Sequence, residues 1–259
     1  MYNTWMYASY EDSDDAANLA KALGIRRIKH ENSAFRGARD RFVINWGSSY
    51  RNWNHVIDGS IVLNDPNYVG QSINKVRFFE RMEGDKSPRC PDWTTRQGEA
   101  RNWLQHGKMV IARTQIKGRQ GKGIVVMKNL LDFVEAPLYT IHIPSITEYR
   151  LYMFGDDVID AREKRQPARA KPDKDNIRID DRGYLYYQMD NGVDDLPDDV
   201  IKQGKLAMAK TGLLFGGLDV LWDGKKAWVL EMNTAPYLGA ITVRKYADAF
   251  TRYIGERQK

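Results

Sequence analysis

Apolar residues recur along this chain with two spacings, one typical of β-strands and the other typical of α-helices. Short apolar runs bounded by turn residues predict strands, and apolar positions three or four residues apart predict helices. The predicted strands cover residues 5–9, 26–30, 42–46, 109–116, 124–127, 138–143, 149–154 and 158–162. The predicted helices cover residues 14–23, 69–82, 98–106, 130–134, 197–211 and 242–253. The strand–helix–strand alternation at the start predicts a small α/β lobe, and the later elements belong to a different lobe.

The segment at residues 216–236 reads GGLDVLWDGKKAWVLEMNTAP and predicts two buried strands joined by a tight connection. Three oxygen-bearing side chains, Asp219, Glu231 and Asn233, interrupt its otherwise apolar pattern. An unpaired carboxylate is costly to bury, so two carboxylates in such strands need a partner. A hard divalent cation, usually Mg²⁺ carrying a nucleotide phosphate, commonly fills this role. The alternative is a hairpin that exposes one carboxylate on each strand.

The spacing of these residues sets a condition on the connection between the two strands. A connection of three or five residues centred on Lys225 places Asp219 opposite Glu231, with Cβ atoms about 4.5–5.5 Å apart. Asn233 then lies on the same face, because side chains alternate along a strand. A two-residue turn at residues 223–224 would put the two carboxylates on opposite faces, so the metal hypothesis excludes that turn.

A glycine-rich segment between two predicted strands is the second signal for nucleotide binding. Its residues are Gly118, Arg119, Gln120, Gly121, Lys122 and Gly123. Glycines permit positive φ angles and close backbone approach, and exposed N–H groups in such a turn bind anions. The P-loop pattern GxxxxGK[ST] is absent and no helix follows, and no HRD or DFG sequence indicates a protein kinase. A flexible hairpin without a ligand is the alternative.

Basic residues on or beside predicted strands are candidates for binding phosphate or substrate, namely Arg113, Arg150, Lys164 and Arg165. The planar guanidinium group suits a phosphate. The alternative for the first two is a structural ion pair, and for the last two a solvated basic loop. Residues 161–174 hold six Lys or Arg against two acidic residues, which predicts a mobile loop.

The composition is that of an ordinary globular protein, with 29% charged and 11% aromatic residues among 259. The single cysteine, Cys90, cannot form an internal disulfide, which fits a reducing compartment. We expect no signal peptide and no membrane span, because neither pattern is present. The net charge of +6 favours acidic ligands such as nucleotides, nucleic acid or an acidic peptide, or solubility alone. The histidines lack metal-ligand spacing, and no GxSxG motif indicates a serine nucleophile.

Together, the acidic hairpin, the glycine-rich segment and the basic strand residues resemble the ATP-grasp superfamily. The resemblance covers residues 75–240 and is closest to amino-acid ligases that add glutamate to protein or small-molecule carboxylates. It implies a pre-ATP-grasp α/β lobe at residues 1–84, followed by two α+β lobes at residues 85–140 and 141–259. ATP is then expected between the sheets of the two α+β lobes.

The resemblance also implies roles for individual residues. The nucleotide-binding positions are Lys75, Arg113, the glycine-rich segment, the hinge residues Thr140, Ile141, His142 and Ile143, and Glu148 and Asn176. His142 stands where the family's hinge usually has a glutamate, and Glu148 is the candidate substitute. Arg150, Lys164 and Arg165 correspond to the catalytic basic residues, and Asp219, Glu231 and Asn233 correspond to the magnesium ligands. The phrase EMNTAPYLG has Tyr237 where glycine is common, so the acceptor pocket is expected to differ there.

The implied activity is ATP-dependent formation of an amide from a carboxylate and an amine, through an acyl phosphate and with Mg²⁺. Two alternatives stay open: an ATP-grasp kinase, and a nucleic-acid-binding protein that uses the basic segment with Tyr184, Tyr186 and Tyr187. The expected partners are ATP, a small-molecule or peptide carboxylate and an amine, and dimers are common in the family. The short chain also resembles ATP-grasp proteins of bacteriophages. We expect a cytoplasmic protein, in the host cell if a phage encodes it.

Overall fold

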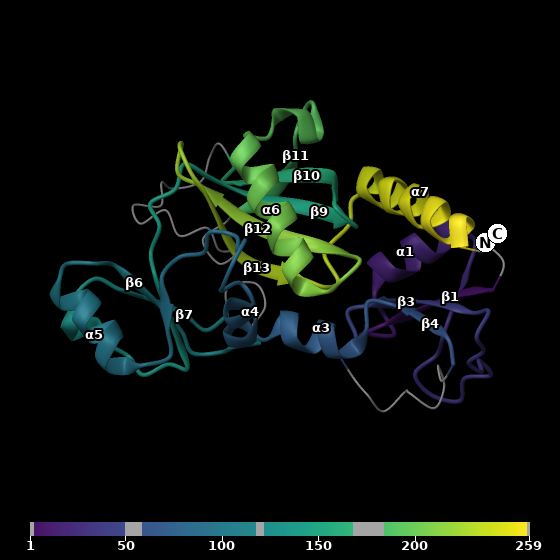
Figure 1. The fold of residues 1–259 in the computed structure, drawn as a ribbon, viewed down its shortest axis with the longest axis horizontal. Coiled ribbons are helices and arrows are strands. Elements are labelled where there is room, and N and C mark those ends of the chain that lie inside the picture. Colours follow the sequence, from purple (N-terminus) through teal and green to yellow (C-terminus); the bar gives the residue numbers. More distant parts are fainter. Residues whose placement is uncertain (1–2, 50–58, 118–121, 168–183, 258–259) are drawn as a thin grey trace.

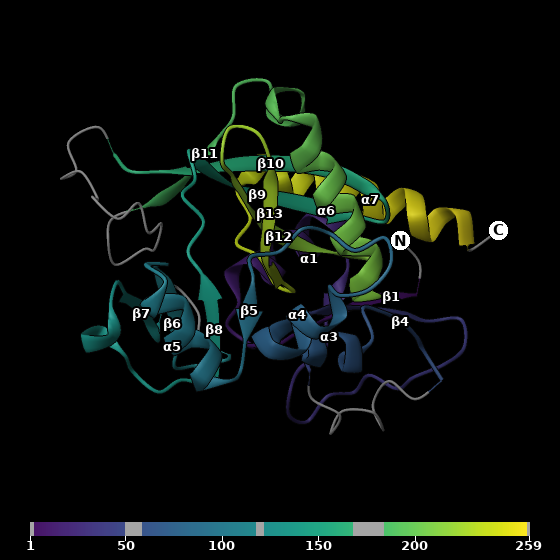
Figure 2. The ribbon, with the colours of Figure 1, turned by 60° about the vertical axis from the view of Figure 1, so that its left-hand side comes forward.

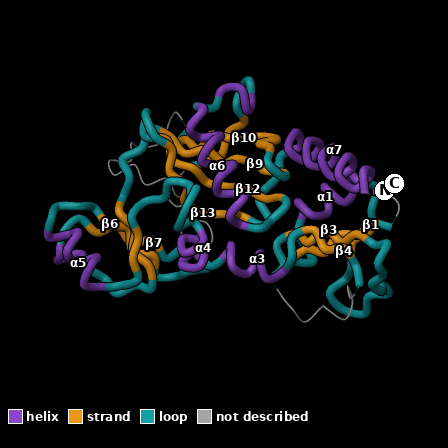
Figure 3. Tube along the Cα trace, in the orientation of Figure 1, coloured by secondary structure: helices purple, strands orange, loops and turns teal. Residues whose placement is uncertain are grey.

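The computed structural model describes residues 3–49, 59–117, 122–167 and 184–257. Within these ranges the strands form three sheets, two with four strands and one with five. The five-stranded sheet lies at the centre, between the N-terminal sheet and the third sheet (Figure 1). Figure 3 separates the three groups of strands, shown in orange, from the helices that pack on them. This is the mixed α/β and α+β architecture that the sequence predicts.

The N-terminal sheet is parallel and has the order β2-β1-β3-β4. Its strands are β1 (Thr4–Ala8), β2 (Arg26–Arg27), β3 (Phe42–Trp46) and β4 (Ile61–Leu63). Helix α1 (Asp14–Leu23) begins where the Ser13 side chain accepts a hydrogen bond from the Ala16 N–H. It ends at Gly24, whose φ of 63° is easily adopted without a side chain. The predicted strand at residues 26–30 is shorter than expected, and β4 has too few residues for a periodic signal.

The single helix predicted at residues 69–82 is wrong, because two helices occupy this region. They are α3 (Pro66–Ile73) and α4 (Lys75–Arg81). Asn74 interrupts them with an extended backbone (φ −87°, ψ 110°), and its side chain accepts hydrogen bonds from the first N–H groups of α4. An asparagine cap offers the backbone an alternative to helix continuation, which apolar spacing does not reveal. The interruption makes Lys75 the first residue of α4.

The third sheet is antiparallel, with the order β5-β8-β6-β7. Its elements are β5 (Trp93–Thr94), α5 (Gln97–Gln105), β6 (Val110–Arg113), β7 (Ile124–Met127), the 3₁₀ helix η1 (Leu130–Asp132) and β8 (Leu138–Ile141). Ala100 and Leu104 of α5 pack on Val110, Met127 and Tyr139 of the sheet. The strand predicted at residues 109–116 ends early, at Arg113. The N–H of the next residue, Thr114, donates a hydrogen bond to the Gly123 carbonyl at the base of the glycine-rich segment.

The central sheet is antiparallel and has the order β11-β10-β9-β12-β13. Its strands are β9 (Thr147–Phe154), β10 (Asp157–Arg165), β11 (Leu185–Gln188), β12 (Phe215–Trp222) and β13 (Ala227–Asn233). Phe154 pairs with Asp157, so two residues connect β9 to β10 where the sequence predicts three. The sequence did not predict β11, whose exposed and half-exposed residues lack a clear apolar alternation.

The predicted connection between β12 and β13 is also wrong, although the predicted pairing is right. Trp222 pairs with Ala227, and the Asp223 N–H bonds to the Lys226 carbonyl, so residues 223–226 connect the strands in place of the three or five residues that we expected. A β-bulge between Asp219 and Val220 then shifts the register by one residue. The shift places Asp219 opposite Glu231 as predicted.

Two apolar cores fix the central sheet in place. Helix α6 (Asp198–Thr211), which follows the 3₁₀ helix η3 (Gly192–Asp195), packs on one face through Val200, Ala207 and Met208. Helix α7 (Ala240–Arg257) and α1 pack at one end of the other face, around Phe215, Tyr246 and Phe250. Figure 2 shows α6 and α7 running along the sheet. None of the helices within the described ranges has the length and apolar character of a membrane span.

Candidate functional site

One face of the central sheet carries a group of polar side chains that come from all five strands. Because side chains alternate along each strand, residues of one parity share a face. A single cross-strand row links Gln188, Arg162, Arg150, Asp219 and Glu231 as successive backbone partners. The neighbouring row links Tyr186, Lys164 and Glu148. The opposite face holds the apolar residues that pack on α6.

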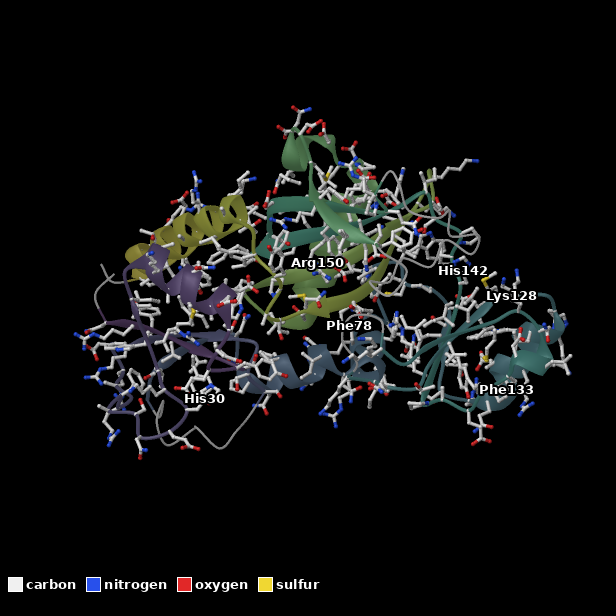
Figure 4. The ribbon with its side chains drawn as sticks, turned by 180° about the vertical axis from the view of Figure 1, so that it is seen from behind. His30, Phe78, Lys128, Phe133, His142 and Arg150 are labelled. Carbon is white, nitrogen blue, oxygen red and sulfur yellow. The ribbon has the colours of Figure 1, made fainter. Side chains whose placement is uncertain are left out.

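Asp219 is the best-buried carboxylate of the predicted metal trio, at 3% exposure. Arg150 binds it with two hydrogen bonds, Nε to Oδ1 and Nη2 to Oδ2, each 2.7 Å long. The Asn233 amide also donates to Asp219 Oδ2, at 3.2 Å. Burial alone would lower the pKa of Arg150, but the Asp219 carboxylate raises it well above its usual value. Arg150 therefore stays charged at the middle of the sheet (Figure 4).

Glu231 is held by cations that come from outside the central sheet. Lys75 Nζ lies 2.8 Å from Glu231 Oε2, and Arg113 Nη1 of β6 lies 4.0 Å from the same atom. Burial alone would raise the pKa of Glu231, but the charges of Lys75 and Arg113 outweigh it and lower the pKa to about 2. The interruption at Asn74 brings Lys75 here, at the start of α4. Glu231 of β13 thus connects the central sheet to α4 and to β6.

A second ion cluster adjoins the first on the same face. Lys164 Nζ lies 3.4 Å from Glu148 Oε1, and the Tyr186 hydroxyl donates to that oxygen at 3.0 Å. The same hydroxyl accepts a hydrogen bond from Arg150 Nη2, and the Arg150 guanidinium lies 4.1 Å above the Tyr186 ring. Burial raises the pKa of Glu148, although the Lys164 charge opposes the rise. Burial also raises the pKa of Tyr186, which keeps its hydroxyl protonated.

No protein-family model and no curated protein matches this sequence, but solved structures match almost the whole chain. The ATP-grasp ligase PsnB, complexed with a minimal precursor, has a TM-score of 0.68 over 99% of both chains at 15% identity. D-alanine–D-alanine ligase from Bacillus anthracis, complexed with ATP, has a TM-score of 0.66 over 98% of this chain and 97% of that one, at 10% identity.

A RimK domain ATP-grasp protein from Sphaerobacter thermophilus has a TM-score of 0.63 over 95% of this chain and 98% of that one, at 10% identity. This chain has the ATP-grasp fold. The polar face and the basic residues of the third sheet and α4 meet between two of its sheets. The structure therefore brings together Lys75, Arg113, Glu148, Arg150, Lys164, Asp219, Glu231 and Asn233.

The structure does not support every role that the sequence suggested for individual residues. Arg165 follows Lys164 and projects to the other face, where its guanidinium lies 4.8 Å from the Tyr187 ring centre and 4.0 Å from Glu163. Glu148 lies in the ion cluster, so its contacts do not support a role in ribose recognition. Gly118, Arg119, Gln120, Gly121 and Asn176 fall outside the described residues.

The predicted adenine hinge lies where the chain leaves the third sheet for the central sheet. Thr140 is buried inside the sheet, between β5 and β6. The Ile141 N–H bonds to the Asp92 carbonyl, and the His142 N–H bonds to the Met109 carbonyl, each at 2.9 Å. Ile143 follows on the way to β9. Figure 4 shows His142 between the two sheets. The N–H groups of Ile141 and His142 thus already donate hydrogen bonds to carbonyl groups of the protein.

The described end of the glycine-rich segment shows why a glycine is required there. Gly123 has a φ of 79°, and a Cβ atom at this position would lie 2.9 Å from both the Gln115 nitrogen and the Thr114 hydroxyl. Its carbonyl accepts a hydrogen bond from the Thr114 N–H, which closes the base of the segment. Lys122 is exposed beside it.

The donor set of the acidic trio fits Mg²⁺ in chemistry, since two carboxylates and an amide supply hard oxygen ligands from one face. In the part of the chain that the structure describes, no three His, Cys, Asp or Glu side chains gather into a metal-binding group. Asp219 and Glu231 would therefore have to share the ion with oxygens from elsewhere. A cationic side chain lies against each of the two carboxylates, Lys75 against Glu231 and Arg150 against Asp219.

Sequence reasoning missed two residues of the site. The sequence presents Tyr186 only as a candidate stacking residue for nucleic acid, yet its hydroxyl links Glu148 to Arg150. Arg162 is the last residue of a predicted strand, yet it is 8% exposed and lies opposite Arg150. The signal for Arg162 was its even spacing from Lys164 on a strand. Tyr186 carried no such signal because β11 itself was not predicted.

Proposed function

We propose that this protein is an ATP-dependent carboxylate–amine ligase that forms an amide through an acyl phosphate. The ATP-grasp fold supports this proposal, and the neighbours named above include ligases of amino acids and peptides. The observation that carries it is the convergence of Lys75, Arg113 and Arg150 on the carboxylates of Glu231 and Asp219. We further propose that the carboxylate substrate belongs to an amino acid or a peptide, as in the glutamate-adding ligases.

The reaction brings an anionic carboxylate to an anionic γ-phosphate, so charge neutralisation is its main requirement. Lys75 and Arg113 approach from α4 and β6, and Arg150 from the central sheet, so they surround a phosphate from different sides. Such preorganised cations stabilise charge that develops in phosphoryl transfer, because they need little reorganisation at the moment of reaction.

Asp219, Glu231 and Asn233 would hold Mg²⁺, which would supply positive charge against the nucleotide phosphates. The chain's own residues prepare for such a ligand set. Arg150 and Lys75 orient the two carboxylates, and each cation would become available to a phosphate if its carboxylate bound the metal ion instead. Lys164 stays beside Glu148, one row further along the face.

The proposal is tested by measuring phosphate release from ATP across pairs of amino acids, peptides and polyamines. A ligase releases phosphate only when both a carboxylate and an amine are supplied, and hydroxylamine in place of the amine converts the acyl phosphate to a hydroxamate. We expect Asp219→Asn to lower the rate at least about 100-fold. The exposed Glu80→Gln is the matched control, and it should keep the wild-type rate. ATP binding without amide or hydroxamate from any pair would contradict ligase chemistry.

A kinase that acts on a hydroxyl predicts a phosphate ester that is stable to hydroxylamine, and a kinase that acts on a carboxylate predicts an acyl phosphate as the released product; both products form without an amine. The nucleic-acid alternative is less well supported by the contacts. Tyr184 is 6% exposed, and Tyr186 is engaged with Arg150 and Glu148, so neither ring presents a free stacking surface. A kinase product would replace the ligase proposal while leaving the nucleotide site in place.

A further inference from the structure

Arg162 of β10 is a buried cation whose charge is not compensated by an ion pair within the described ranges. The residue is 8% exposed, and its Nε atom is buried with no hydrogen-bond partner. Among the described residues, no carboxylate forms an ion pair with this guanidinium. The other buried cations of the same face, Arg150 and Lys164, each bind a carboxylate. Arg162 is therefore the exception on a face that is otherwise charge-compensated.

The surroundings of Arg162 show a place built for its guanidinium. The group lies 5.9 Å from the Tyr152 ring centre and 5.5 Å from the Tyr237 ring centre. A Cβ atom at residue 239 would lie 1.8 Å from Arg162 Nη2, so a larger residue there would displace the end of the Arg162 side chain. Tyr237 is 62% exposed, so the ring beside the guanidinium lies at the surface.

The carboxylates of Asp160 and Asp15 accept hydrogen bonds from groups other than Arg162. Asp160 accepts hydrogen bonds from Thr242 and Lys245, which anchor α7. Asp15 accepts a hydrogen bond from the Leu238 N–H at 2.8 Å. Burial raises the pKa of Asp15, and the charge of Arg162 offsets only part of that rise. Burial of an unpaired charge is costly, so a fold that retains one without a structural partner gains nothing in stability from it.

We propose that Arg162 binds a carboxylate group that the reaction leaves unchanged, so that one substrate is an amino acid or peptide acid with a free carboxylate beyond its reacting group. This inference rests on the proposed ligase function for the identity of the reaction. A guanidinium group binds a carboxylate with two parallel hydrogen bonds, which discriminates an acid from its amide.

The position of Arg162 sets the size of that substrate. Arg162 is the backbone partner of Arg150, and Arg150 is the partner of Asp219. Two strand spacings separate Arg162 from the metal-ligand candidate, which corresponds to about 10 Å between backbones. Side chains on one face stand roughly perpendicular to the sheet, so a separation of this order also holds between the groups that Arg162 and Asp219 would bind. A four- or five-carbon acidic amino acid, or the corresponding peptide residue, spans such a gap.

The experiment measures thermal unfolding of the full chain with Mg-ADP and matched pairs of ligands: L-glutamate and its α-amide, and glutarate and its monoamide. The variants are Arg162→Met, Arg162→Lys and, as control, Arg252→Met, which removes an exposed arginine of α7. We expect the acids to stabilise the wild type and the control more than the amides do. In Arg162→Met the apparent dissociation constant of the acids should rise about 10- to 100-fold, and Arg162→Lys should recover part of it.

Stability without ligand separates a binding residue from a structural one. Because no carboxylate of the described ranges forms an ion pair with Arg162, Arg162→Met should unfold at the same temperature as the wild type or higher. Three results would each overturn the inference: a fall of several degrees in this variant, equal acid binding by it and the wild type, or no preference for acid over amide in the wild type. Acid binding that depends on Arg162 without any ATP-dependent amide formation would refute the ligase proposal alone.

Discussion

The substitution Glu231→Gln separates the electrostatic role of this carboxylate from its shape. In the free protein Glu231 pairs with Lys75 at 2.8 Å and faces Arg113 at 4.0 Å. Its pKa is lowered from 4.5 to about 2, and a shift of that size corresponds to at most about 3 kcal/mol of stability. Its side chain is 27% exposed, so solvent screening brings the expected loss in the variant at pH 7 to about 2 kcal/mol.

The pH dependence provides the sharper test, and its sign follows from the lowered pKa. A carboxylate with a depressed pKa stabilises the fold fully above its unfolded pKa, and that stabilisation is lost as the pH falls through the folded pKa. The difference between the wild type and Glu231→Gln should therefore be full above about pH 5 and shrink steadily between pH 4.5 and about 2.

Urea unfolding at several pH values measures this difference, with Glu80→Gln as a control that shows little change at any pH. Glu231→Gln should also lose amide formation, because a carboxylate that is a candidate metal ligand is replaced by a neutral amide. A stability difference between Glu231→Gln and the wild type that stays constant from pH 7 to pH 2.5 would refute the paired state of Glu231. Normal turnover by Glu231→Gln would refute its place in the reaction.

Three further changes test the local geometry. Asn74→Ala removes the cap of α4 and should cost about 1 kcal/mol in urea unfolding and weaken ATP-analogue binding, whereas Asn74→Asp should retain most of both. Tyr186→Phe leaves Glu148 without a hydroxyl donor and should cost about 1–3 kcal/mol by the same measurement; an unchanged midpoint would show that this bond is dispensable. Burial raises the pKa of Cys90 to about 12, so iodoacetamide at pH 8 should label it far more slowly than a free thiol, and rapid labelling of the folded protein would contradict this burial.

The sequence by itself determined the helices and strands in which apolar residues recur with a clear local periodicity. The strands of the central hairpins, α1, α6 and the pairing of Asp219 with Glu231 follow from alternation, capping and spacing, and they are present as predicted, although the connections between the paired strands differ. The strands β4 and β5 have too few residues to show a period, and β11 lacks a clear apolar alternation. Asn74 divided a helix through a side-chain hydrogen bond that competes with the helical backbone.

Only the tertiary structure decided which charges meet. Lys75 and Glu231 are far apart in sequence, and their ion pair exists because α4 and β13 pack together in the fold. The bulge in β12 restored a register that the turn alone would have reversed, and local turn chemistry carries no information about it. Arg162 is distinguished from Arg150 solely by what surrounds it, since both are arginines on neighbouring strands of one sheet. Charge compensation depends on distances between segments, and these are set by packing rather than by any pattern along the chain.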